Sequence, residues 1–349
     1  MLLAMRAYQL VRPGQAELRE AEIPQAGPGE VLLRVAAAGV CHSDLHLVHA
    51  PSAPFPLPFT LGHEVAGTVA EAGPGVDGWA RGDGALAYLC WGCGRCRACA
   101  RGAENACEAF PRGQVPGPGL GFPGAMAEYL VVPARHLVAL GDLDPVAAAP
   151  LTDAALTSLH AIETVRDRLH PGSVAVVIGV GGLGHMAVQL LRATSPARIV
   201  AVDTDPGRLA LAGEHGADLM VAAGADAAPR VLADTGGRGA DAVLDLVGSD
   251  LTLDLAAAVV ATEGHICIVG LARGTLPVVA APPGRRAQPW GTTVSRPDGA
   301  TVPELHDVVA LARAGRIAAA VQPFPLDEAP EVFARLEAGG IRGRAVLVP

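Results

Sequence analysis

The chain has 349 residues, enough for one large or two ordinary domains. Hydrophobic residues make up 50% of the chain and charged residues 17%, a composition typical of a globular protein with a buried core. The formal net charge of −9 argues against nucleic acid as a partner. All 26 cationic residues are arginines, so mechanisms that need a lysine amine are excluded.

The N-terminal part, up to roughly residue 145, reads as short strands between turns, which predicts a mainly β region. Strand-like stretches occupy 30–40 and 67–73. GPG turns follow one another at 27–29, 73–75 and 117–119. The first ten residues are too short and too soon charged for a signal peptide, so we expect a cytoplasmic protein. In that compartment, clustered cysteines are more often metal ligands than disulfides.

From about Pro150 onward, helical and strand-like segments alternate, and the strands are apolar throughout. In chain order we expect a helix at 154–165, strand 174–181, helix 185–193, strand 197–203, helix 206–216, strand 241–248, helix 251–261, strand 265–272, helix 304–317 and strand 343–349. Up to residue 272 this order predicts a parallel, doubly wound sheet. The last helix and strand, at 304–317 and 343–349, belong to a tail of mixed character. The apolar run 174–191 has the length of a membrane span, but four glycines interrupt it, so we interpret it as strand, turn and helix and expect no membrane association.

A glycine-rich turn sits between the predicted strand 174–181 and the helix after it. Its G-x-G-x-x-G pattern comprises Gly179, Gly181, Gly182, Leu183 and Gly184. In this context the pattern indicates that a dinucleotide pyrophosphate binds at the helix N-terminus.

An acidic residue, Asp203, ends the next predicted strand. A carboxylate there suits a ribose 2′-hydroxyl and repels a 2′-phosphate, which favours NAD over NADP. Arg208 lies just beyond and either contacts the adenosine ribose or is a solvated helix charge.

Five of the seven cysteines lie between residues 90 and 107. Cys93, Cys96, Cys99 and Cys107 have the spacing C-x2-C-x2-C-x7-C, and four thiolates this close can surround one zinc ion and leave no open position. Cys90 forms a further C-x2-C pair with Cys93, so spacing alone leaves the alternative set 90/93/96/99 open.

A second group of metal-ligand types lies upstream, in GVCHSDLH (39–46) and GHEVAGTVAEAGPGV (62–76). The latter fits G-H-E-x2-G-x5-G-x2-V. With the cysteine spacing, the glycine motif, Asp203 and the closing GGIRGRAVLVP, the chain resembles the zinc-containing medium-chain alcohol dehydrogenases over nearly its whole length, and among them the bacterial NAD-dependent secondary alcohol dehydrogenases.

The resemblance implies how these residues act on a metal. Cys41, His63 and Asp153 match three ligands of a catalytic zinc with one open position; animal enzymes have cysteine where this chain has Asp153. Glu64 matches an acid beside the zinc that can bind it transiently, and Asp44 matches the carboxylate that orients His63. The structural zinc of the family uses the x2-x2-x7 spacing, which includes Cys107 and leaves out Cys90.

The resemblance also assigns catalytic and cofactor residues. Ser43 matches the hydroxyl that takes the alcohol proton, and His46 the base that passes it toward solvent through the cofactor ribose. The further residues that match cofactor contacts are Thr157, Val247, Val269, Leu271 and the pyrophosphate-binding Arg342. The apolar ones among them can equally be ordinary sheet core.

The implied fold is α/β, with a Rossmann-type NAD-binding domain at 151–297 and a mainly β, GroES-like catalytic domain at 1–150 and 298–349 that carries a structural zinc lobe at 90–110. The implied assembly is a homo-oligomer, a tetramer or dimer. Relatives carry an aromatic residue where this chain has Gly299, so we expect room for a bulky substrate there, with Trp290 supplying part of the wall.

The expected activity is NAD-dependent interconversion of secondary alcohols and ketones, with two zinc ions per chain. A polyol or aldehyde dehydrogenase of the same family is an alternative. A non-catalytic NAD sensor with a zinc lobe is a third, and the joint presence of Cys41, Ser43, His46, His63 and Asp153 argues against it.

Overall fold

Two units divide the chain in the computed structural model, which describes residues 4–111, 114–279 and 288–349. Unit 1 contains Met1–Leu156 and Gly299–Pro349, and unit 2 contains Thr157–Asp298. The limits expected from the sequence, 150 and 297, lie a few residues before these divisions. No described helix is both long and apolar enough to cross a membrane.

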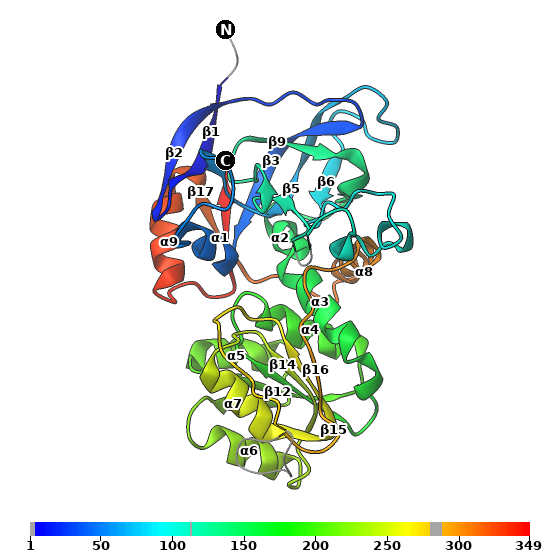
Figure 1. Ribbon diagram of the computed structural model, residues 1–349, viewed down its shortest axis with the longest axis vertical. Helices are drawn as coiled ribbons and strands as arrows, with labels where there is room; N and C mark the ends of the chain where they lie inside the picture. The colour runs from blue at the N-terminus through cyan, green and yellow to red at the C-terminus, as the bar shows by residue number, and fades with distance from the viewer. Residues whose placement is uncertain (1–3, 112–113, 280–287) are drawn as a thin grey trace. The chain divides into compact units, whose positions relative to one another are not determined.

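Unit 1 is built mainly from antiparallel strands (Figure 1). Its strands are β1 (Ala4–Arg12), β2 (Gln15–Glu22), β3 (Glu30–Val40), β4 (Phe59–Thr60), β5 (Glu64–Ala72), β6 (Gly84–Ala87), β7 (Gly117–Pro118), β8 (Gly121–Phe122), β9 (Tyr129–Pro133), β10 (Leu137–Ala139), β17 (Val321–Pro325) and β18 (Arg344–Val348). Its helices are α1 (His42–Val48), α2 (Pro145–Ala148), α8 (Val302–Arg313) and α9 (Ala329–Glu337), with 3-10 turns η1 (Cys99–Arg101), η2 (Glu104–Ala106), η3 (Ala134–His136), η4 (Ala149–Thr152) and η6 (Leu326–Glu328).

The main sheet of unit 1 has the strand order β10-β6-β5-β3-β18-β17, with β9 also paired to β3. The long strand β3 is central because it reads as apolar on both faces, and most of its side chains are buried. Its first half pairs with β9 and its last residues with β18, while β5 runs antiparallel along its other side. Strand β3 therefore brings the chain's C-terminal strand next to the segment that begins at residue 62.

Unit 2 contains a six-stranded, all-parallel sheet of order β13-β12-β11-β14-β15-β16. Its elements are α3 (Ala154–Thr164, which begins in unit 1), η5 (Arg166–Arg168), β11 (Val174–Ile178), α4 (Gly184–Thr194), β12 (Arg198–Asp203), α5 (Pro206–Glu214), β13 (Leu219–Ala222), α6 (Ala227–Asp234), β14 (Ala240–Asp245), α7 (Asp250–Val259), β15 (Val260–Ile268) and β16 (Thr293–Ser295). Helices α4 and α5 pack together, as do α6 and α7. The predicted parallel, doubly wound sheet is confirmed.

The strand order reverses between β11 and β14, which are neighbours although β12 and β13 separate them in sequence. Ligands of open α/β sheets bind at such a reversal, beyond the carboxyl ends of the strands. The glycine-rich turn Gly179–Gly184 follows β11 directly and therefore lies at this position.

Candidate functional site

Three elements of unit 1 bring Cys41, His63 and Asp153 together. Cys41 follows β3 and His63 precedes β5, and because Gly39 of β3 pairs with Glu64 of β5 the two residues leave the sheet at the same place. Asp153 follows the 3-10 turn η4. Ligand atoms of Cys41, His63 and Asp153 all lie within 4.8 Å of one another, and all three residues are buried.

The turn that carries Asp153 is fixed to strand β5 by Thr152. The Thr152 hydroxyl accepts the backbone N–H of Val65 at 3.2 Å and donates to the carbonyl of Ala149 at 2.9 Å. A buried hydroxyl with both bonds made holds the end of η4 against the start of β5. This contact places Asp153 beside the side chain of His63, which is two residues before Val65.

The His63 imidazole is 1% exposed, yet neither ring nitrogen has a hydrogen-bond partner within the described residues. Its Nδ1 lies 3.4 Å from Asp44 Oδ1 and its Nε2 lies 3.5 Å from Asp153 Oδ2. Burial alone would lower the pKa of His63, but the carboxylates of Asp44 and Asp153 raise it well above its ordinary value. A buried imidazole without partners, beside a thiol and a carboxylate, fits a zinc ion bound through Nε2.

Asp44 is fully buried and is held by two backbone groups. Its Oδ2 accepts the N–H of Cys41 at 2.9 Å, and its Oδ1 accepts the N–H of Gly62 at 3.3 Å. Asp44 thus bridges the segments that carry two of the candidate ligands, and it faces His63 Nδ1. This position suits the predicted role of orienting the His63 ring.

Arg344, at the start of β18, is the residue of this centre that the sequence analysis did not identify. Its guanidinium donates from Nε to Glu64 Oε2 at 2.9 Å and from Nη2 to Glu64 Oε1 at 2.5 Å and Asp153 Oδ2 at 2.8 Å. Burial raises the pKa of Glu64, and Arg344 opposes that rise. Glu64 therefore lies beside the three candidate ligands with both carboxylate oxygens bonded to Arg344.

The predicted proton-transfer residues lie on the short helix α1, which begins directly after Cys41. Ser43 Oγ lies 3.6 Å from Cys41 Sγ, so its hydroxyl borders the candidate metal centre. His46 is three residues further on the same helix and is exposed. His49, which the sequence analysis did not assign to catalysis, faces Glu337 with its Nε2 3.2 Å from the Oε1.

The four cysteines with the x2-x2-x7 spacing form a second group. Their Sγ atoms are separated by 3.4 Å between Cys96 and Cys99, 3.8 Å between Cys96 and Cys107, and 4.0 Å between Cys93 and Cys99. Four thiolates placed tetrahedrally at the usual zinc–sulfur distance of about 2.3 Å would be about 3.8 Å apart. None of the cysteines in the described part of the chain forms a disulfide, and the group has the size of a zinc site.

Backbone N–H groups point at these sulfur atoms. The N–H of Cys93 donates to Cys107 Sγ at 3.2 Å, and those of Cys99 and Glu108 donate to Cys96 Sγ at 3.4 Å each. The bonds from Cys99 and Glu108 lower the pKa of Cys96 to about 6. The loop thus favours the thiolate form, which is the form that binds metal.

Cys90 is outside this group and packs against Gly299. A Cβ atom added to Gly299 would lie 2.4 Å from Cys90 Sγ, and the φ angle of +57° also favours glycine. The space that a side chain at 299 would need is therefore filled by Cys90, so the structure gives no support to the expected enlargement of a substrate pocket there. Trp290 belongs to unit 2 and is exposed.

In the glycine-rich turn after β11, backbone segments approach each other so closely that only glycine fits, as the sequence motif predicts. A Cβ on Gly184 would lie 2.0 Å from the carbonyl oxygen of Gly179, and Gly179 itself has a φ angle of +87°. A Cβ on Gly181, in contrast, would meet no atom within 4 Å. The backbone of the turn therefore packs closely against the start of α4 at Gly184, while the space around Gly181 is free. This arrangement leaves room for a pyrophosphate over the N-terminus of α4.

Asp203, the last residue of β12, is joined to this turn. Its Oδ2 accepts the N–H of Val180 at 2.6 Å, its Oδ1 accepts the N–H of Asp205 at 2.9 Å, and Arg208 Nη1 lies 3.9 Å from Oδ1. The carboxylate is thus held beside the glycine turn.

The other predicted cofactor residues follow the carboxyl ends of neighbouring strands. Val247 comes after β14, and Val269 and Leu271 come after β15. Val247 touches the glycine turn, because a Cβ on Gly179 would lie 2.5 Å from its Cγ2. Thr157 lies within α3 of unit 2, and Arg342 is an exposed residue of unit 1.

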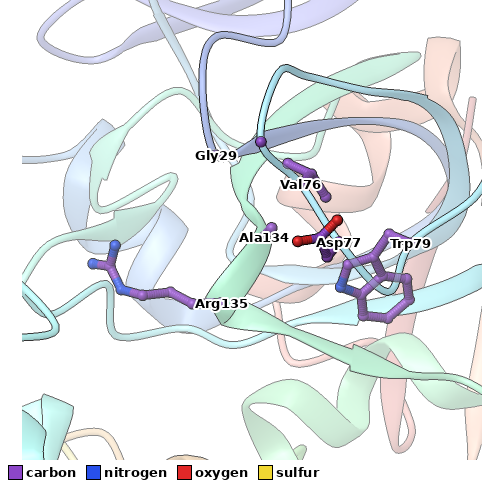
Figure 2. A pocket seen from close by; sticks show the side chains of 7 residues that line it. Gly29, Val76, Asp77, Trp79, Ala134 and Arg135 are labelled. Carbon is purple, nitrogen blue, oxygen red and sulfur yellow. The ribbon is translucent and has the colours of Figure 1, made fainter.

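Unit 1 also has an open hollow of about 380 Å³ (Figure 2). Gly29, Gly75, Val76, Asp77, Trp79, Ala134 and Arg135 line it. In Figure 2 the Arg135 side chain points away from Asp77 and Trp79, and its guanidinium donates to the carbonyl of Gly92 beside the cysteine group. No predicted site residue lines this hollow, so it is separate from both candidate metal centres.

Two protein-family models match the chain. They are described as the alcohol dehydrogenase GroES-like domain, over residues 27–142, and the zinc-binding dehydrogenase, over residues 182–307.

Individual proteins are similar over almost the whole length. An NAD-dependent alcohol dehydrogenase of Sulfurisphaera tokodaii is 36% identical, with 99% of this chain and 100% of the relative covered. A D-arabinose 1-dehydrogenase (NADP(+)) of Saccharolobus solfataricus is 34% identical, with 95% and 94% covered. The crystal structure of the alcohol dehydrogenase of Aeropyrum pernix matches with a TM-score of 0.90 at 34% identity, with 99% of this chain and 100% of that chain covered.

Proposed function

The chain belongs to the zinc-containing medium-chain alcohol dehydrogenase family, and we propose that it interconverts secondary alcohols and ketones with NAD and a catalytic zinc. The observation that carries this proposal is the convergence of Cys41, His63 and Asp153 within 4.8 Å, around an imidazole that lacks hydrogen-bond partners in the described structure. One thiolate, one imidazole and one carboxylate leave a tetrahedral zinc with one open position for substrate.

When bound, the zinc would polarise the alcohol oxygen as a Lewis acid and NAD would accept the hydride. Asp153 and Cys41 would supply two negative charges to the bound zinc, so that the metal and its three ligands together would carry little net charge. Asp44 Oδ1 lies 3.4 Å from His63 Nδ1 and Asp153 Oδ2 lies 3.5 Å from Nε2, so Asp44 is placed to orient the ring with Nε2 toward Asp153.

The proton of the alcohol would leave through helix α1. Ser43 Oγ borders Cys41 Sγ and is the hydroxyl placed to receive that proton. His46 follows three residues later, which puts it on the same side of the helix, and it is exposed. An imidazole with solvent access can pass the proton to water near neutral pH.

We propose that the cysteine group holds a second zinc that does not meet substrate, since four thiolates leave no open position. We further propose that the glycine turn and Asp203 bind the pyrophosphate and the adenosine ribose of NAD. The remaining assigned contacts, Thr157, Arg208, Val247, Val269, Leu271 and Arg342, are part of this cofactor proposal.

A polyol or sugar substrate is the second candidate, because the Saccharolobus solfataricus relative is a D-arabinose 1-dehydrogenase. NADH formation should be followed across aryl and long-chain secondary alcohols, 2-propanol, ethanol, pentoses and an aldehyde, with zinc counted on the same sample. The proposal expects two zinc ions per chain and the highest kcat/KM with a secondary alcohol. A highest value with a pentose would favour the second candidate. One zinc without NADH formation would favour a non-catalytic sensor.

Replacing Asp203 by asparagine should raise the KM for NAD by about tenfold with little change in kcat, because a lost ribose hydrogen bond costs about 1–1.5 kcal/mol. The ratio of kcat/KM for NADP to that for NAD should rise, since the repelling charge is gone. Initial rates with both cofactors measure this, and Asp254→Asn, an exposed carboxylate of α7, is the control. An unchanged KM for NAD would remove Asp203 from the ribose site.

A further inference from the structure

One peptide unit of the glycine turn is left almost unrestrained by its own residues. It joins Gly181 to Gly182, and both residues are partly exposed. Neither has a Cβ, so the peptide plane between them can rotate at little steric cost. Packing does not hold it either, because even an added Cβ on Gly181 would meet no atom within 4 Å. The orientation of this peptide must therefore be fixed by another residue.

The orientation of the same peptide decides which group a phosphate would meet. In a trans peptide the C=O and N–H groups point in opposite directions. A Gly181 carbonyl directed toward helix α4 therefore turns the N–H of Gly182 away from the helix, which is the side on which a pyrophosphate would lie. Within the described structure this N–H donates to no other group. The reverse orientation would present a carbonyl oxygen to the anion.

His185, which directly follows the last glycine of the motif, holds the carbonyl of Gly181. The helical bond from the backbone N–H of His185 to this oxygen is long, at 3.2 Å, and the ring Nδ1 of the same residue lies 3.1 Å from the oxygen. A carbonyl oxygen only accepts, so the proton of the second bond is on Nδ1. The His185 ring is 0% exposed, and its centroid lies 6.1 Å from that of His215. A packed ring holds the carbonyl more firmly than the first turn of a helix, which frays.

A second carbonyl of the turn is also held from the protein side. The hydroxyl of Ser158, a fully buried residue of helix α3, donates to the carbonyl oxygen of Leu183 at 3.1 Å. Side chains of two helices thus draw carbonyl groups of the turn inward. The N–H groups of the turn are left for an anion.

We propose that His185 is a positioning residue that holds the Gly181–Gly182 peptide with its N–H toward the cofactor pyrophosphate. The inference rests on the proposed binding of NAD at this turn. His185 acts through the backbone and does not itself contact NAD. Its loss should therefore weaken binding of a diphosphate and leave binding of the adenosine part unchanged.

The test measures binding of ADP and of adenosine to the full-length, zinc-loaded protein by isothermal titration calorimetry. Adenosine lacks the pyrophosphate, so it reports on the rest of the pocket. In the wild type, ADP should bind more tightly than adenosine. His185→Phe keeps a buried ring but has no Nδ1–H. Its Kd for ADP should rise by about tenfold, the effect of one weakened hydrogen bond to a charged group, while the Kd for adenosine stays within about twofold of wild type.

Two further variants separate the hydrogen bond from packing. Asparagine places an amide N–H close to the position of a histidine Nδ1–H, so His185→Asn should return the Kd for ADP to within about threefold of wild type. His215→Phe makes the same change in the neighbouring ring, whose Nε2 has no hydrogen-bond partner in the described structure. This matched control should bind ADP as the wild type does.

The opposite results overturn the inference. If His185→Phe raises both Kd values alike, or if His215→Phe weakens ADP binding as much, the ring only supports packing. If His185→Asn behaves like His185→Phe, the Nδ1 proton has no role. If His185→Phe does not fold, His185→Leu decides, and a wild-type Kd for ADP in it removes the role of His185. A wild-type protein that binds ADP no better than adenosine would remove the proposed pyrophosphate site itself, and this inference with it.

Discussion

Replacing Asp153 by asparagine is expected to empty the Cys41–His63 centre and to lower kcat/KM for the alcohol by about a thousandfold or more. Loss of residues that only orient ligands typically costs 10–100-fold, so loss of a ligand should exceed that range. The amide has the same size, and its oxygen can still accept from Arg344 Nη2. The fold should therefore remain while the anionic ligand is lost.

Metal analysis should find one zinc per chain in the purified Asp153→Asn protein and, by the proposed assignment, two in the wild type. Initial-rate kinetics and a thermal melt on the same sample distinguish a loss of catalytic activity from a loss of the folded structure. Asp142→Asn, an exposed carboxylate paired with Arg313, is the control and should retain both zinc ions and full activity. Wild-type kcat with one zinc missing would show that the third ligand has been assigned to the wrong residue.

The parallel sheet was the most predictable part of the molecule. Its strands carry uninterrupted apolar residues because both faces are covered, and the helices between them start near recognisable signals such as Asp205 before α5, which accepts the N–H of Arg208. The strand expected at 265–272 in fact begins at Val260. In sequence, its first residues look like a continuation of helix α7. In the structure they belong to the strand, which contains the left-handed Glu263 (φ +60°) and an irregular register with β14.

The candidate centre could be found in sequence only through the resemblance. Cys41, His63 and Asp153 are far apart in the chain, and long-range strand pairing, which no local pattern encodes, is what brings them together. Arg344 illustrates the limit: Arg342 was assigned because GGIRG matches a family motif, whereas the buried arginine is two residues later. An arginine heading an otherwise apolar strand was the available signal, since a charge there needs a buried partner.

The cysteine group gives the largest expected effect on stability. In Cys107→Ser, a hydroxyl replaces a thiolate that also accepts the N–H of Cys93, so one zinc per chain should be lost. Losing a structural metal is among the few single changes that cost about 4–5 kcal/mol. At about 2–4 °C per kcal/mol, the Tm should fall by roughly 10 °C or more.

Cys90→Ser is the matched comparison, because Cys90 is a buried thiol beside the group that packs on Gly299. It should retain both zinc ions and keep its Tm within about 3 °C of wild type, the effect of roughly 1 kcal/mol. Zinc counting and calorimetry on the two variants decide which four sulfur atoms bind. If Cys90→Ser loses a zinc and Cys107→Ser does not, the set is 90/93/96/99, and the sulfur geometry seen here has been misinterpreted. If zinc-depleted Cys107→Ser keeps its kcat per folded molecule at low temperature, the chemistry belongs to the other centre alone.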